Sequence, residues 1–211
     1  MRSVLFSAAV AIFVVLAPLR PLLAAPATPY AVDPARSRVT LHVGKTGVFS
    51  VFGHAHVIAA PVASGEIRFD AEHPASSSVR LVFDAGALEV TGAGEPAADV
   101  PAVQATMLSG RVLDVARFPQ ITYESRKIEV LEQNAGRLRL RIAGVLTLHG
   151  VAMPESADVA VEIAGDAITA TGALDVKQTD FGMAPVTAGG GTVRVRDAVG
   201  VRLSIVARRG S

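Results

Sequence analysis

Residues 137–142 read Arg-Leu-Arg-Leu-Arg-Ile, a strict alternation of charged and apolar side chains. Successive side chains of a β-strand point to opposite faces, so this stretch predicts a strand with one wet face and one dry face. The same period of two recurs at residues 38–43, 66–70, 79–84, 158–163 and 201–206. Short strands that are apolar on one face are typical of antiparallel sheets that form a barrel or a sandwich.

Turn-forming residues separate the alternating stretches. Asn134-Ala135-Gly136 and Gly165-Asp166 both lie between alternating segments, which predicts hairpin loops at these two places. No repeat of fixed period, low-complexity tract or internal linker divides the chain. We therefore expect a single domain.

One segment, residues 99–112, breaks the period of two. Its apolar residues Val103, Met107 and Leu108 recur at helical intervals, and Pro101 suits a first helical turn that Asp99 caps. We therefore expect a short helix here, between the early and the middle strands. The loop before it, residues 91–96, is either a connector or a lid over a barrel mouth.

Composition excludes several classes of function. The chain of 211 residues has a formal net charge of +1, no Cys, no Trp and two Tyr. It has neither a basic block nor stacking aromatics, so no nucleic-acid partner is expected. No Gly-x-Ser-x-Gly motif, phosphate-binding glycine loop or His-Glu-x-x-His motif occurs either. The sequence predicts a protein that is not an enzyme and that uses no cofactor.

Residues 1–27 have the order of a secretory signal peptide. Arg2 precedes an uncharged apolar run, Val4–Leu16, and small residues follow near position 25. We expect cleavage after Ala24 or Ala27, which leaves residues 28–211 as one domain in the periplasm or outside the cell. A membrane span needs about 20 residues, so no stable span is expected after cleavage. The alternative is a retained N-terminal anchor.

Five motifs, in order along the chain, resemble those of the YceI-like family of periplasmic lipid-binding barrels. They are Tyr-Ala-Val-Asp-Pro-Ala-Arg-Ser at 30–37, Ser-Gly-Glu-Ile-Arg-Phe-Asp at 64–70, the segments 113–125 and 144–151, and Lys-Gln-Thr-Asp-Phe-Gly-Met at 177–183. The resemblance implies an all-β fold, a lipocalin-like antiparallel β-barrel of about eight strands with the short helix between early and middle strands. It also implies a non-catalytic carrier of an isoprenoid or other amphiphilic lipid held in the barrel interior.

An isoprenoid tail has no hydrogen-bonding group and needs only a dry tunnel, whereas a polar head group needs partners near the mouth. The candidate ligand-binding residues are therefore aromatic and polar side chains: Phe49, Phe52, His54, His56, Phe69, Phe83, Lys177, Asp180 and Phe181. Lys177 and Asp180 are candidates for ordering the mouth near a head group. Asp180 has a structural alternative, in which it accepts backbone hydrogen bonds in a tight turn before Gly182.

His54 and His56 support a different function. If they lie on a strand, they point to the same face about 7 Å apart, a spacing that permits metal chelation. A third ligand would come from elsewhere in the chain: His42, His149 or Asp180. The alternative is that both rings form structural hydrogen bonds or line a polar mouth.

Two further alternatives stay open at the level of sequence. Alternation does not distinguish a hollow barrel from a filled one, so a solid-cored stability or interaction module is the third hypothesis. The stripe of Arg137, Arg139 and Arg141 is either a solvated strand face or a site for an anionic head group. The sequence sets neither the identity of the ligand nor the oligomeric state.

Overall fold

The computed structural model describes residues 27–46, 56–94, 96–188 and 193–210. The strands in these ranges are β1 (Thr28–Val32), β2 (Arg38–Thr46), β3 (His56–Ala59), β4 (Val62–Phe69), β5 (Ser78–Asp84), β6 (Glu89–Val90), β7 (Gln120–Asn134), β8 (Arg137–Leu148), β9 (Val151–Ala164), β10 (Ala167–Lys177), β11 (Thr187–Ala188) and β12 (Val193–Arg209). The helices are α1 (Val100–Leu108) and three short 3₁₀ turns, η2 (Pro74–Ser76), η3 (Ala85–Ala87) and η4 (Gln178–Phe181).

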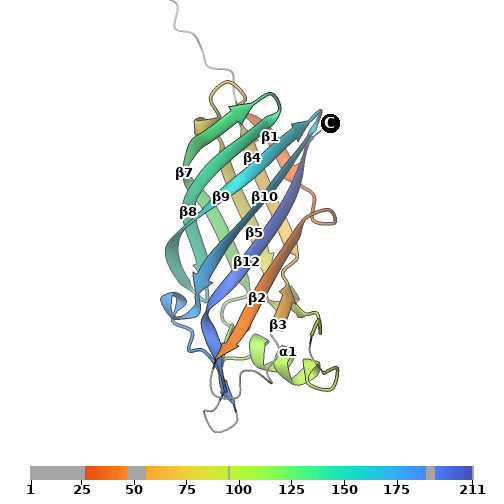
Figure 1. The fold of residues 1–211 in the computed structure, drawn as a ribbon, viewed down its shortest axis with the longest axis vertical. Helices are drawn as coiled ribbons and strands as arrows, with labels where there is room; N and C mark the ends of the chain where they lie inside the picture. Colours follow the sequence, from red (N-terminus) through yellow and green to blue (C-terminus); the bar gives the residue numbers. More distant parts are fainter. Residues whose placement is uncertain (1–26, 47–55, 95, 189–192, 211) are drawn as a thin grey trace, which may run out of the picture.

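Eight of these strands close into an antiparallel barrel, which confirms the expected fold (Figure 1). The ring runs β1-β4-β5-β7-β8-β9-β10-β12 and closes where β12 pairs with β1, with Ala31 opposite Arg208. Further along β12, β2 pairs with it, with Leu41 opposite Val201. β3 and β6 then continue the sheet from β2. Closure gives each strand of the ring a paired neighbour on both sides.

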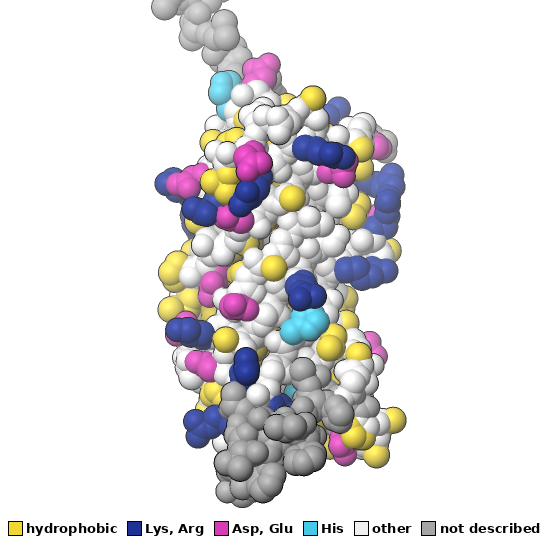
Figure 2. Space-filling view, viewed as in Figure 1, with side chains coloured by type: hydrophobic (Ala, Val, Ile, Leu, Met, Phe, Trp, Pro, Cys, Tyr) yellow, Lys and Arg dark blue, Asp and Glu magenta, His cyan; other side chains and the backbone are white. Residues whose placement is uncertain are grey.

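The alternation that predicted strands also assigns the two faces of the barrel. On β8, Leu138, Leu140 and Ile142 are buried, whereas the intervening arginines are exposed. Arg141 donates two hydrogen bonds to Asp158 on β9, at 2.7 and 3.0 Å. Figure 2 shows positive and negative side chains interspersed over the face in view. The arginine stripe is therefore a solvated face that is paired with acidic neighbours.

Both expected hairpin turns are present. Gly136 lies between β7 and β8 with a φ of 73°, and Gly165 lies between β9 and β10 with a φ of 60°. Because this left-handed region is open to glycine at no steric cost, the two glycines suit these tight turns.

The barrel is filled at the end where β1 begins and β12 ends, uppermost in Figure 1. Tyr30, Ile168 and Ala207 are at most 2% exposed there, and Phe69 is buried with them. Ala207 lies opposite Ile168 on one neighbouring strand and opposite Val32 on the other. This end is a closely packed core without room for a guest.

The predicted helix is confirmed as α1, at the opposite end of the barrel (Figure 1). Asp99 occupies the N-cap position and Pro101 the first turn, but the Asp99 side chain makes no capping hydrogen bond and the helix ends at Leu108. Within the described part of the chain, no helix is long and apolar enough to cross a membrane.

Candidate functional site

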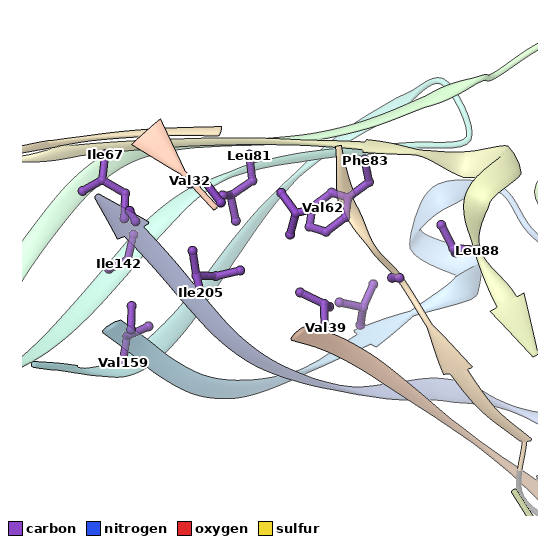
Figure 3. Close-up of a cluster of buried hydrophobic side chains, with 14 of the residues drawn as sticks. Val32, Val39, Val62, Ile67, Leu81, Phe83, Leu88, Ile142, Val159 and Ile205 are labelled. Carbon is purple, nitrogen blue, oxygen red and sulfur yellow. The ribbon is translucent and has the colours of Figure 1, made fainter. Parts of the chain in front are cut away.

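A cavity of about 530 Å³ lies inside the barrel, between the packed core and α1. This size is within the range of about 300–1,000 Å³ that is usual for small-molecule sites. Most of its lining is aliphatic, contributed by inward-facing residues of β2, β3, β4, β5, β7, β8, β9, β10 and β12. Figure 3 shows part of this wall converging on the interior from several strands: Val39, Ile67, Leu81, Phe83, Ile142, Val159 and Ile205.

Small side chains create the space. Ala60, Ala157 and Ala170 line the cavity at inward positions, whereas inward positions of the packed end hold Phe69 and Ile168. Alternation decides which residues face inward, and side-chain volume then decides whether the interior is filled. The barrel is therefore solid at one end and hollow toward the other.

Helix α1 covers the hollow end. Ala102, Val103, Thr106 and Met107 line the cavity from this helix. By contrast, the described residues of the 91–96 loop are absent from the lining and mostly exposed. The sequence suggested the 91–96 loop as a possible lid, but the element that lines the cavity here is helix α1.

A single glutamine joins α1 to the sheet. The Val90 N–H donates to Oε1 of Gln104 at 2.7 Å, and Nε2 of Gln104 donates to the Leu88 carbonyl at 2.8 Å. The side-chain amide therefore occupies the place that the peptide group of a neighbouring strand would take beside β6. These two bonds fix α1 against the sheet from its middle turn.

Among the cavity-lining residues, a few are polar: Lys45, His56, Thr106, Tyr123, Glu155, Ser156 and Gln178. Tyr123 on β7 lies against Gly144 of β8, because a Cβ at Gly144 would come within 2.8 Å of the Tyr123 Cζ and hydroxyl. The Tyr123 hydroxyl donates to the Ile142 carbonyl at 3.2 Å. Burial, and secondarily the nearby charge of Glu155, raise the pKa of Tyr123 to about 12.

Glu155 brings a carboxyl to the same wall. It lies on β9 directly opposite Gly144, and its inward position follows the parity of Val159 and Val161 further along the strand. Burial raises the pKa of Glu155, and the charge of Asp180 adds to the effect. Tyr123, Gly144 and Glu155 thus form a polar notch across three adjacent strands, which we call the β7–β9 notch.

The tight turn at η4 is closed by backbone groups. Gly182 has a φ of 73°, and its N–H donates to the Thr179 carbonyl at 3.1 Å. The carboxylate that supports this turn is Asp197, which accepts from the Thr179 N–H at 2.9 Å and from its hydroxyl at 2.7 Å. These bonds lower the pKa of Asp197. The expectation that Asp180 accepts the hydrogen bonds of this turn is wrong for the described residues.

The structure brings only some of the predicted site residues to the cavity. Phe83 and His56 line it, whereas Phe69 and Phe181 are buried outside the lining. Lys177 and Asp180 are exposed beside and within η4, and they do not line the cavity. Three candidates lie outside the described residues: Phe49, Phe52 and His54.

The metal hypothesis is untested, because His54 is not described. Of the suggested third ligands, His42 lies opposite Val57, out of phase with the inward pair Val43 and His56. His149 is engaged elsewhere, with its Nδ1 3.1 Å from the Phe181 carbonyl oxygen. No group of three potential metal-ligating His, Asp or Glu residues occurs within the ranges that the structure describes.

Sequence reasoning missed Tyr123 and Glu155. The alternation along β9 contains the signal for Glu155. Val161 and Val159 face inward, so residues 157 and 155 are expected to face inward too, and residue 155 is an acid. Tyr123 carries no such signal, because a tyrosine on a strand is an ordinary wall residue. Its role becomes visible only when Gly144 is placed beside it on the next strand.

Comparison with known proteins identifies a family. The family model described as "YceI-like domain" matches residues 30–207. A comparison with curated proteins finds no match.

Several solved structures share the fold. BcnA from Burkholderia cenocepacia has a TM-score of 0.65 at 20% identity, covering 83% of this chain and 98% of that one. A polyisoprenoid binding domain from Saccharophagus degradans, implicated in plant cell wall breakdown, has a TM-score of 0.60 at 12% identity, covering 86% and 98%. A YceI protein from Campylobacter jejuni has a TM-score of 0.52 at 14% identity, covering 73% and 82%. At such identities the likeness concerns the fold.

Proposed function

This chain belongs to the YceI-like domain family, and on that premise we propose that it is a non-catalytic carrier of an isoprenoid or similar amphiphilic lipid. The observation that supports the proposal is the apolar cavity of about 530 Å³ inside the barrel. The similarly folded Saccharophagus degradans protein is described as a polyisoprenoid binding domain, which agrees with this use of the fold.

The cavity suits a hydrocarbon tail for a simple physical reason. Each buried CH₂ group contributes about 0.8 kcal/mol, so an unbranched or methyl-branched chain needs no specific contact to bind. A water molecule takes ~30 Å³ in the liquid. If each carbon takes the same volume, the cavity of about 530 Å³ accommodates roughly 18 carbons. We therefore expect tails of three to four isoprene units to be held inside.

We propose that the carrier works in the periplasm or outside the cell. The pattern of charged, apolar and small residues over 1–27 supports export. Expression of the whole chain in a Gram-negative host, followed by cell fractionation and mass measurement, tests this. A periplasmic product that begins at Ala25 or Thr28 is expected, and a full-length cytoplasmic product would contradict export.

Binding is tested by native mass spectrometry of purified residues 28–211 with farnesol (15 carbons) and geranylgeraniol (20 carbons). A one-to-one complex is expected with each alcohol. Ala170→Phe should abolish the complex, because this side chain would fill the cavity from β10. Thr171→Phe is the matched control, because the next residue on the same strand is exposed on the outer face. If no complex forms with any isoprenoid, or if both variants bind equally, the proposal fails.

A further inference from the structure

The carboxyl of Glu155 is an unusual wall group for a cavity lined mainly by aliphatic side chains. It projects from β9 opposite Gly144, and the absence of a side chain at Gly144 lets the Tyr123 ring and hydroxyl lie over β8 at this position. Desolvation of an acid without compensating hydrogen bonds is costly. A cavity that served only as a hydrocarbon tunnel would hold an aliphatic residue at this position.

Among the described residues, Glu155 has no counter-charge on its own wall. Within the described ranges, no hydrogen bond or ion pair joins its carboxyl to another residue, and the charged group that acts on it is the carboxylate of Asp180. Partial burial and this neighbouring charge both raise the energy of a negative charge on Glu155. The basic lining residue Lys45 comes from β2, and β10 and β12 intervene between β9 and β2 in the sheet.

We infer that the β7–β9 notch is a recognition site for the polar group of the ligand, and that it selects a hydrogen-bond donor without negative charge, an alcohol or a protonated amine. The inference rests on the proposed carrier function and names the class of ligand that the carrier prefers. A donor placed against Glu155 supplies the partner that the fold withholds, and hydrogen bonds to charged groups are among the stronger ones. A phosphate or carboxylate end would instead add a third acidic group beside Glu155 and Asp180.

The test uses four ligands with the same 15-carbon tail: farnesane, farnesol, farnesylamine and farnesyl monophosphate. Their dissociation constants are measured at pH 7.5 by displacement of a fluorescent fatty alcohol. We expect farnesol and farnesylamine to bind at least roughly tenfold more tightly than farnesyl monophosphate, the effect of one hydrogen bond to a charged group. Equal affinities for the three polar ligands, or a preference for the phosphate, would overturn the inference.

Variants at the notch separate charge from hydrogen bonding. Glu155→Gln removes the charge but keeps an acceptor, so it should weaken farnesylamine roughly tenfold or more, affect farnesol less, and strengthen farnesyl monophosphate. Glu155→Leu removes both and should weaken farnesol as well, while farnesane binding is unchanged or improved. Should the leucine variant fail to fold, the opposite shifts of amine and phosphate in Glu155→Gln still decide the matter.

Glu162→Gln is the matched control. Glu162 is an exposed acid on the outer face of the same strand, 3.4 Å from Arg137, and its loss should change none of the four affinities. If Glu155→Gln behaves like Glu162→Gln, the inference fails while the carrier function stands. If no ligand binds the parent protein, farnesane included, the carrier function fails and the inference with it.

Discussion

Substituting one alanine in the cavity wall distinguishes a hollow barrel from a filled one by the sign of its effect on stability. Ala170 on β10 lines the cavity, and Leu at this position would extend three more carbons into the space. In a filled interior, the same change would force neighbouring side chains off their rotamers. We therefore predict that Ala170→Leu stabilises the ligand-free protein.

The magnitude follows from the added surface. At about 0.8 kcal/mol per buried CH₂, three carbons contribute at most about 2.4 kcal/mol. Loss of side-chain rotamer freedom removes about 0.5–1 kcal/mol of this, which leaves a stabilisation of roughly 1.5 kcal/mol. For a domain of about 185 residues, that corresponds to a rise in Tm of roughly 3–6 °C.

Ala207→Leu is the matched control, because Ala207 on β12 is completely buried in the packed end, between Ile168 and Val32. Overpacking there should destabilise by about 1–3 kcal/mol. The two variants are compared by urea unfolding followed by far-ultraviolet circular dichroism, on protein stripped of lipid. If Ala170→Leu is destabilised as much as Ala207→Leu, the interior at Ala170 is filled and the reasoning from the cavity is refuted.

Three other predictions concern the notch and the covering helix. Gly144→Ala should lower stability by about 1–3 kcal/mol, because its Cβ would collide with the rigid Glu124 carbonyl oxygen. Gly210→Ala, which has open space around it, should have no effect in the same thermal melts. Glu155→Gln should be more stable than the parent at pH 7.5. Because the pKa of the folded state is raised above 4.5, the parent loses stability as pH rises through that pKa. The difference should therefore vanish in urea titrations below about pH 4, and a constant difference would contradict a titrating Glu155. Gln104→Leu should speed hydrogen exchange of amides within residues 100–108 while β8 and β9 stay protected, because it removes the two bonds that join Gln104 to Leu88 and Val90. Unchanged exchange would show that these bonds do not hold the helix.

The strands and turns were predictable because they depend on local rules. The alternation at Leu138, Leu140 and Ile142 requires only that one face be dry, and this remains true in any sheet that contains β8. Gly136 and Gly165 likewise satisfy a local demand for positive φ. Pairing of β12 with β1 joins residues near opposite ends of the chain, and no local pattern specifies that contact. The order of the strands became an expectation only through resemblance to a family.

The candidate site was harder to predict than the fold, because it depends on small differences in side-chain volume. The sequence favours aromatic residues as cavity walls, and Phe83 lines the cavity, yet Phe69 and Phe181 are buried outside a lining that is mostly aliphatic. A hollow interior differs from a filled one by a few methyl groups at inward positions. The alternation of polar and apolar residues does not report how large the inward side chains are. The sequence favours Asp180 as the acceptor in a turn that backbone groups and Asp197 close, because Asp197 lies 18 residues beyond Thr179 and only the folding of the chain brings the two together.

Glu155 shows how parity carries functional information that hydropathy alone does not. The acid at 155 has the same parity on β9 as the buried Val159 and Val161, so the same rule places it inward. Stability would favour an aliphatic residue there, because the partly buried carboxyl of Glu155 is disfavoured in its charged form by desolvation and by the charge of Asp180. Glu155 breaks the rule that inward positions of β9 hold apolar side chains. Such an exception inside a cavity is expected where function requires a residue that does not favour folding. The cost of the Glu155 charge in the empty protein and its benefit in the protein loaded with farnesylamine are therefore two measurements of the same group, and both should diminish together in Glu155→Gln.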